Sequence, residues 1–220
     1  MKPNFLWREM GPVLAAVSSL LISQMTFYIL WRRSFFLLLA AGCTAFLAFT
    51  FYFFRDPERR IPDRDDVLLA PADGRILSVE TDMESPLGDG PVSRIVIFLS
   101  LWDVHVNRVP VTGKVDRIEY RPGRFLPAFS GHASARNEQT LIRIRTGGGF
   151  IVLKQVAGLF ARRIVCDLRT HQEVKAGQRF GMIKFGSRVE LFVPDGNSLR
   201  ICQGSRIKAG ETILGDWIHA

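Results

Sequence analysis

Cysteine is scarce in this chain, and the cysteines present follow no recognisable pattern. The 220 residues include three of them, Cys43, Cys166 and Cys202, and their separations match no metal-ligand spacing. The sequence therefore predicts neither a disulfide framework nor a metal site. We expect the part of the chain outside its apolar runs to lie in a reducing compartment.

Nucleic-acid-binding motifs are also missing, although the chain is strongly basic. Its formal net charge is +8 and its calculated isoelectric point is about 9.9. Yet the sequence contains no helix-turn-helix, zinc-finger or RNA-binding motif, and its basic residues are spread through strand-like segments. An anionic lipid headgroup surface fits this charge better than a nucleic acid does.

Charge is absent from two long apolar runs near the N-terminus, residues 13–31 and 34–54. At about 1.5 Å per residue, each run is long enough to cross a hydrocarbon core as a helix. Arg32 and Arg33 separate them, so the sequence predicts a helical membrane hairpin over residues 1–54. A cleaved signal peptide followed by one anchor is disfavoured, because the first run is longer than a usual signal core and has no small-residue cleavage site.

Basic residues at the ends of these runs predict the orientation of the hairpin. Six arginine or lysine residues lie on its outer flanks, and two lie in the connecting turn. The positive-inside rule then places both ends of the hairpin, and the rest of the chain, on the cytoplasmic side of the cell (inner) membrane. The first run is the less apolar of the two, and if it lay in the membrane interface instead, the topology would change.

A sustained helical period is absent after residue 60, where short alternating runs and glycine turns take over. Residues 55–66 form a polar connector, and residues 67–220 are expected to form a mostly β catalytic domain of barrel-sandwich, lipoyl-like architecture. A short helix is possible within 124–138. The expected strands cover residues 75–80, 92–100, 113–120, 139–146, 149–157, 162–168, 180–193 and 206–214.

A weak internal repeat supports this architecture. Residues 173–181 (EVKAGQRFG) are similar to residues 206–215 (RIKAGETILG). Both resemble the hammerhead turns of lipoyl- and biotinyl-carrier domains. No recognition residues flank a lysine at an exposed tip, so the repeat indicates the architecture and not a carrier function.

The pair Gly186-Ser187 interrupts the strand-like run 180–193. Such a pair usually marks a turn or a bulge. It also permits a reaction, because the Ser187 hydroxyl can attack the unhindered Gly186 carbonyl if the backbone is strained. The resulting ester would eliminate to dehydroalanine and hydrolyse to a pyruvoyl group at a new N-terminus. This chemistry requires a group that accepts the serine proton and donors that stabilise an oxyanion.

Two further residues have the chemistry that this reaction requires. His105, in DVHVNR, is of the residue type that exchanges protons near neutral pH. Asp73, in PADG, could orient an imidazole or accept a hydrogen bond itself. Each also has an ordinary explanation, since a lone histidine is often a satisfied polar residue and Asp-Gly is a common turn pair.

Seven segments follow one another between about residues 50 and 216: FFRDPERRIP, APADGRIL, LSLWDVHVNRVPVTGKV, YRPGRFLPAF, ARNEQT, VAGLFARRIV and FGMIKFGSRVELFVP. In these segments and their order, the chain resembles the short prokaryotic (archaeal-type) phosphatidylserine decarboxylases. The resemblance implies a membrane-bound, pyruvoyl-dependent carboxy-lyase that cleaves itself between Gly186 and Ser187 into a large chain, 1–186, and a small chain, 187–220. The pyruvoyl group would form a Schiff base with phosphatidylserine, release carbon dioxide and give phosphatidylethanolamine.

The resemblance leaves a gap at the catalytic histidines. Longer members of the family carry two histidines three positions apart; the first corresponds to His105 and the second falls at Arg108. Arginine does not act as a general base near pH 7. Either His105 serves both cleavage and decarboxylation, or Asp73 acts more directly, or backbone strain drives cleavage. Arg108 and His132 are candidates for binding the lipid headgroup.

Two other functions remain open from the sequence. One is a membrane-anchored β module that binds anionic lipid without cleaving itself, and the other is a pyruvoyl decarboxylase for a different amino-acid headgroup. The mass of the chain separates the first from a decarboxylase, because self-cleavage releases a fragment of residues 187–220. The sequence is compatible with a homo-oligomer.

Overall fold

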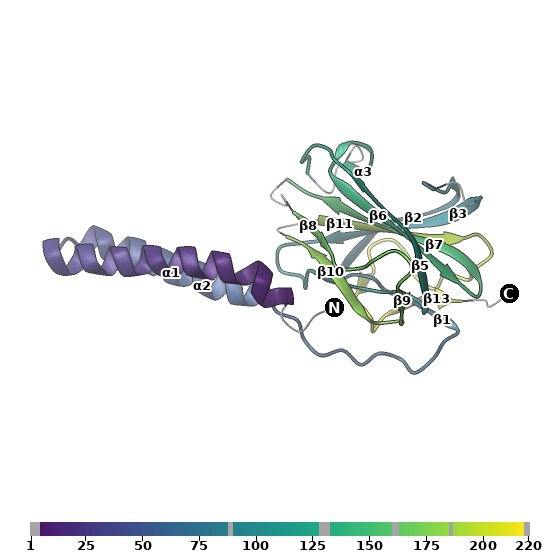
Figure 1. Cartoon of the computed structure of the whole chain (residues 1–220), viewed down its shortest axis with the longest axis horizontal. Helices are drawn as coiled ribbons and strands as arrows, with labels where there is room; N and C mark the ends of the chain where they lie inside the picture. Colours follow the sequence, from purple (N-terminus) through teal and green to yellow (C-terminus); the bar gives the residue numbers. More distant parts are fainter. Residues whose placement is uncertain (1–4, 88–89, 128–132, 160–162, 185–186, 218–220) are drawn as a thin grey trace. The chain divides into compact units, whose positions relative to one another are not determined.

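The computed structural model describes residues 5–87, 90–127, 133–159, 163–184 and 187–217 (Figure 1). The chain divides into two compact units, one containing Lys2–Asp56 and the other containing Pro57–Ala220.

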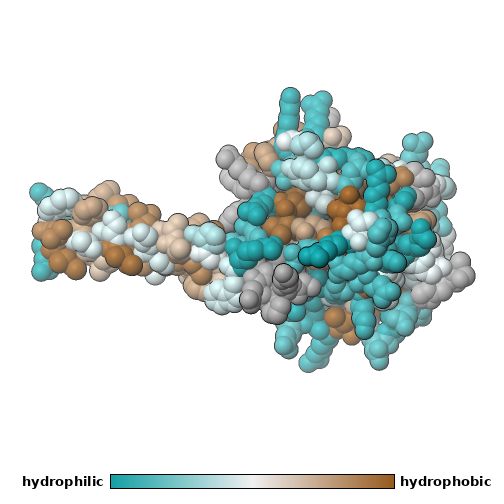
Figure 2. All heavy atoms as spheres, in the orientation of Figure 1, coloured by the Kyte–Doolittle hydropathy of each residue, from teal (hydrophilic) through white to brown (hydrophobic). Residues whose placement is uncertain are grey.

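The first unit is a pair of apolar helices, α1 (Phe5–Trp31) and α2 (Ser34–Phe53), which lie side by side (Figure 1). Arg32, with φ of 51°, lies in the turn between them. The rings of Phe27 and Trp31 on α1 contact Phe36 on α2, with centroids 5.5 and 5.8 Å apart. Both helices are long and apolar enough to cross a membrane, and Figure 2 shows apolar residues along them. The predicted pair of helices is therefore confirmed, with α1 beginning eight residues before the first apolar run.

The second unit is built on a curled antiparallel sheet of eight strands. Their order across the sheet is β12-β2-β3-β11-β7-β6-β5-β9. The expectation of a mostly β domain is thus confirmed. The strands are β2 (Gly74–Glu84), β3 (Pro91–Leu99), β5 (Gly113–Arg121), β6 (Gln139–Thr146), β7 (Gly149–Ala157), β9 (Glu173–Val174), β11 (Ser187–Pro194) and β12 (Arg206–Ile207).

Two small sheets and one short helix, α3 (Ala133–Arg136), complete this unit. One small sheet has the order β4 (Val106–Arg108), β10 (Arg179–Ile183), β8 (Ile164–Cys166), and the other pairs β1 (Val67–Leu69) with β13 (Ile213–Asp216). The expected strand 180–193 is in fact two strands, β10 and β11, because its two halves pair with different partners. Likewise, 206–214 is divided into β12 and β13.

The central strand β11 is buried on both faces of the curled sheet. Val189, Leu191 and Val193 point to its inner face and are fully buried in the main core. Phe192 points to the outer face, where it packs in a smaller apolar cluster with Leu141. Each such side chain contributes about 1.5–3 kcal/mol of burial free energy, so burial on both faces anchors β11 in the sheet.

The sequence repeat corresponds to a structural repeat. After β9 the chain turns at Gly177, and after β12 it turns at Gly210, with φ of 75° and 74°. Glycine adopts this left-handed conformation without a steric penalty. The Gly177 amide donates to the carbonyl of Val109 at 2.8 Å, and the Gly210 amide donates to the carbonyl of Ala70 at 2.9 Å. The two turns therefore close two copies of one motif.

Candidate functional site

Ser187 is the first residue of the central strand, and its side chain is fully buried. Its backbone pairs with Leu99 on β3 and with Ala157 on β7. Its hydroxyl points to the inner face, as Val189 does, and finds no hydrogen-bond partner among the described residues. An unsatisfied buried hydroxyl costs about 1–3 kcal/mol, so its presence calls for a functional explanation. Gly186 lies outside the described residues, so the bond between them is not described.

His105 is fully buried just before β4. Its Nδ1 lies 2.9 Å from the backbone carbonyl oxygen of Asp103. A carbonyl oxygen accepts and never donates, so Nδ1 carries the proton, and in the neutral ring Nε2 is the basic nitrogen. The Asp103 carboxylate accepts hydrogen bonds from the amide and the hydroxyl of Ser100, at 2.8 and 2.7 Å. The loop that orients the imidazole is thereby fixed.

The strand pairings bring His105 and Ser187 to the same end of the domain. β3 ends at Leu99, opposite Ser187, and the chain then runs through the loop that carries His105. Val106, the next residue, pairs with Met182 on β10. The chain continues from β10 into β11, which begins at Ser187. Both connecting loops therefore lie at one end of the sheet, together with the two residues that the sequence predicts as catalytic.

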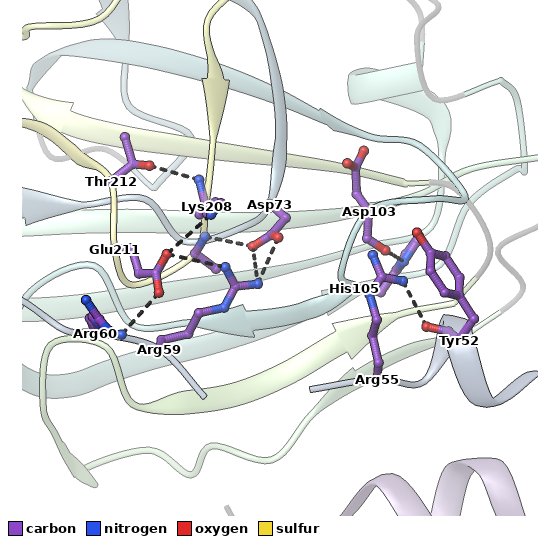
Figure 3. A network of polar contacts seen from close by, with 11 residues as sticks. Tyr52, Arg55, Arg59, Arg60, Asp73, Asp103, His105, Lys208, Glu211 and Thr212 are labelled. Atoms are coloured by element: carbon purple, nitrogen blue, oxygen red, sulfur yellow. Dashed lines mark hydrogen bonds and ion pairs between the residues drawn. The ribbon is translucent and has the colours of Figure 1, made fainter. Parts of the chain in front are cut away.

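Asp73 precedes β2 at this end of the sheet, where its carboxylate is held by two other groups (Figure 3). Arg59 Nη2 lies 3.0 and 2.8 Å from its two oxygens, and the backbone amide of Ala209 donates to Oδ1 at 2.8 Å. Within the described ranges, no hydrogen bond joins Asp73 to His105 or to Ser187. The imidazole is oriented by a backbone carbonyl, and the carboxylate holds a turn.

The structural repeat shows which contacts of Asp73 also occur in the other copy of the motif. The segment Ala70-Pro71-Ala72-Asp73-Gly74 corresponds to Val109-Pro110-Val111-Thr112-Gly113 in the other copy. There, Thr112 Oγ1 accepts a hydrogen bond from the amide of Ala176 at 3.1 Å, as Asp73 accepts from Ala209. Contact with the turn is common to both copies. The ion pair with Arg59 occurs at Asp73 and has no counterpart at Thr112.

The two residues predicted to bind a headgroup are placed differently. Arg108 is buried, and its guanidinium donates to the carbonyl of Gly177 at 3.1 Å, which supports the first hammerhead turn. His132 lies outside the described residues.

Sequence reasoning did not identify one buried pair of amides at this end of the sheet, Asn107 on β4 and Gln155 on β7. Gln155 Nε2 donates to Asn107 Oδ1 at 2.8 Å, and both side chains are fully buried. Gln155 is opposite Val189 and points to the same inner face as Ser187. The signal was a polar residue inside the apolar run IVLKQVA, at an inward position.

A second missed cluster, formed by Lys154, Ser134, Glu190 and Arg188, lies on the outer face of the same strands. Lys154 Nζ donates to the carbonyl and the hydroxyl of Ser134, at 2.7 and 2.9 Å, and lies 3.7 Å from the Glu190 carboxylate. Glu190 also forms an ion pair with Arg188 at 2.6 Å. Burial lowers the pKa of Lys154, and the Glu190 charge partly opposes this effect. The cluster fastens α3 to the sheet.

Comparison with known proteins shows the family of the chain. The family model described as phosphatidylserine decarboxylase matches residues 46–215. The chain belongs to the phosphatidylserine decarboxylase family. The predicted family and its carboxy-lyase class are therefore confirmed.

Three relatives, each named phosphatidylserine decarboxylase proenzyme, show how far the similarity extends. The one from Chlorobaculum tepidum is 48% identical over 179 residues, which is 81% of this chain and 82% of the relative. That from Syntrophus aciditrophicus is 46% identical over 168 residues, 76% of this chain and 79% of the relative. The protein from Paramagnetospirillum magneticum is 43% identical over 223 residues, covering 97% of this chain and 89% of its own length. This last match includes the apolar helices.

Proposed function

We propose that this chain is a membrane-bound phosphatidylserine decarboxylase proenzyme that cleaves itself between Gly186 and Ser187. The observation that carries the proposal is the buried Ser187 hydroxyl at the first position of the central strand, which has no hydrogen-bond partner among the described residues. The relatives' description as proenzymes supports it.

The surroundings of Ser187 fit a pyruvoyl group derived from it. Leu99, Ile97 and Ala157 are fully buried on the neighbouring strands and keep water away from this position. When present, the pyruvoyl group supplies a carbonyl that bonds covalently to the substrate amine and accepts the electron pair released with carbon dioxide. No metal ligand is needed for this chemistry.

His105 is the proposed proton carrier for both steps. In cleavage, its Nε2 accepts the proton of the Ser187 hydroxyl as the oxygen attacks the preceding carbonyl. It then passes this proton to the departing Ser187 nitrogen. In each turnover, the same nitrogen takes up a proton from solvent and gives it to the carbon that has lost carbon dioxide. The hydrogen bond from Nδ1 to the Asp103 carbonyl stabilises the imidazolium that both steps require. This explains how one histidine can serve where Arg108 replaces the second.

Asp73 is proposed to act by positioning. It fixes the turn that leads into β2, and β2 pairs with β3, the strand opposite Ser187. With Arg59 and Ala209, it holds this end of the sheet in place, and among the described residues it forms no hydrogen bond with the Ser187 hydroxyl.

Strand pairing explains how the two products of cleavage would stay together. The small chain, 187–220, contains β11, β12 and β13. Each of these pairs with a strand of the large chain, 1–186: β3 and β7 hold β11, β2 holds β12, and β1 holds β13. The helices α1 and α2 would keep this assembly at the membrane, where a two-chain lipid presents its headgroup, and the flanking basic residues favour the cytoplasmic side.

Intact-mass analysis of the purified full chain, combined with an assay of carbon dioxide release, tests the proposal. We expect the wild type to show two chains, with a blocked N-terminus on the fragment 187–220. Ser187→Ala should remain one chain and be inactive. Ser93→Ala, which alters a buried serine on β3, is the matched control and should cleave normally. A Ser187→Ala chain that still decarboxylated phosphatidylserine would exclude the proposed mechanism, and an uncleaved wild type from active membranes would favour a lipid-binding module.

A further inference from the structure

The buried amide pair Asn107–Gln155 has hydrogen-bonding capacity that the protein does not use. One hydrogen bond joins the two side chains, and Asn107 Nδ2 and Gln155 Oε1 have no partner among the described residues. Both residues are fully buried. Unsatisfied amide groups in such a position are costly, so they point to a ligand that completes them.

The two atoms without a partner are one amide nitrogen and one amide oxygen, whichever way the amides are turned. As described, Asn107 offers an N–H donor and Gln155 offers a carbonyl acceptor. If both amides were rotated, Gln155 would offer the donor and Asn107 the acceptor. The pair therefore presents complementary groups to any ligand between them.

The position of the pair relates it to the reacting residues. Gln155 is opposite Val189, so it is a diagonal neighbour of Ser187 on the same face of the sheet. Diagonal neighbours lie about 7–8 Å apart, which is within reach of a glutamine side chain and a small ligand. Asn107 follows His105 by two residues, and β4, which carries Asn107, begins directly after His105.

We propose that Asn107 and Gln155 recognise the amino-acid part of the lipid headgroup. The free N–H binds the carboxylate that is to be lost, and the free carbonyl accepts from the substrate amine. The inference rests on the proposed function. It attributes to Asn107 and Gln155 the specificity of the enzyme for a headgroup that carries both a carboxylate and an amine. Phosphatidylethanolamine has no carboxylate, so it leaves the amide donor unsatisfied.

A neutral donor suits decarboxylation better than a cation. The carboxylate loses its charge as carbon dioxide departs, so a guanidinium would stabilise the substrate more than the transition state. An amide orients the carboxylate without this penalty. By strand alternation, Arg108 points away from the side of β4 on which Asn107 lies, and it donates to Gly177.

Reductive trapping on the cleaved enzyme tests the proposal. Dioctanoyl phosphatidylserine and its carboxyl methyl ester, which cannot decarboxylate, are each titrated in detergent with cyanoborohydride. The fraction of small chain that carries an adduct is read by intact mass. We expect the wild type to be half-saturated by phosphatidylserine at a concentration about tenfold lower than by the ester, because the ester removes the anionic acceptor. Equal concentrations would overturn the proposal.

Two variants assign this preference to the pair. Asn107→Leu with Gln155→Met removes both amides together and should bring the ratio to about one. Gln155→Glu keeps a partner for Asn107 but places a negative charge beside the carboxylate, so the ester should become the preferred ligand. Gln139→Leu changes a buried glutamine on the outer face and should retain the tenfold preference.

The same mass spectra distinguish a failure of the proposed function from a failure of the headgroup assignment. An uncleaved wild type would overturn the proposed function, and the headgroup assignment with it. Cleaved variants that still prefer phosphatidylserine tenfold would overturn only the role of Asn107 and Gln155. If the double variant does not fold, the proposal is tested by two ratios of half-saturating concentrations, one for Gln155→Glu and one for the wild type.

Discussion

Arg59 Nη2 lies 3.0 and 2.8 Å from the two carboxylate oxygens of Asp73, and both side chains are largely buried. This ion pair joins the polar connector to the turn before β2, so it fixes the end of the sheet at which Ser187 lies. Because both charges are shielded from solvent, loss of one partner is expected to be more costly than at the surface.

Arg59→Gln should lower the melting temperature of the uncleavable Ser187→Ala chain by several degrees, because the Asp73 carboxylate is left with one backbone donor. Thermal unfolding in detergent measures this change. The control is Arg64→Gln, which removes an exposed pair with Asp66 and should cause no measurable shift. An equal change of melting temperature in the two variants would contradict the claim that the Arg59–Asp73 ion pair stabilises the domain.

The rate of self-cleavage distinguishes positioning by Asp73 from direct participation. In a chain that retains Ser187, Arg59→Gln and Asp73→Asn should slow cleavage to a similar extent, since both loosen the same turn. A time course of intact mass after synthesis gives both rates. If Asp73→Asn blocked cleavage while Arg59→Gln left it unchanged, the carboxylate would have to act on the reacting groups itself.

His105→Gln should slow self-cleavage by about 10²-fold or more, because the amide keeps a donor for the Asp103 carbonyl but accepts no proton. The variant therefore preserves the loop and removes the base. Intact mass reports cleavage, and carbon dioxide release by the fraction that does cleave reports the second step. Normal cleavage with lost turnover would confine His105 to decarboxylation.

The lowered pKa of Lys154 predicts that the stability of the folded chain depends on pH. Burial lowers its pKa in the folded chain, so the unfolded chain holds this proton to higher pH. Between the lowered pKa and the ordinary value of 10.5, the unfolded chain therefore binds more protons, and stability rises with pH. We compare the change in melting temperature from pH 8 to pH 10. This change should be more positive in the wild type than in Lys154→Met. Parallel curves would contradict this assignment.

Cys166 should react slowly with iodoacetamide. Burial raises its pKa to about 11 from 9.0, so its thiolate at pH 8 is about 100-fold scarcer than that of a free thiol. Cys202 is exposed and serves as the internal reference. Peptide mapping after timed alkylation measures both rates. Similar rates would show that β8 opens readily.

Local pattern predicted the regular part of the fold well. The bounds 139–146 and 149–157 match β6 and β7, because inward and outward residues alternate and glycines mark the turn between them. The division of 180–193 into β10 and β11 could not be read locally, since it depends on which distant strands pair with each half. β1, β4 and β9 were missed because two or three residues carry no periodicity.

The same limit applies to the site. Ser187, His105 and Asp73 were proposed from the sequence, and the strand pairings bring them to one end of the domain. Their partners were not predicted. Asn107 and Gln155 are 48 positions apart, and nothing in either local segment specifies the other.

The placement of Ser187 in a strand without a free edge has a consequence for the lifetime of the protein. Neighbouring strands occupy both sides of β11, so an external protease or repair enzyme reaches its first residue only if the sheet opens. The backbone rearrangement proposed at that position would therefore have to come from the chain itself, once per molecule. Under the proposed mechanism, each chain would make its reactive group once and would keep it for every later turnover.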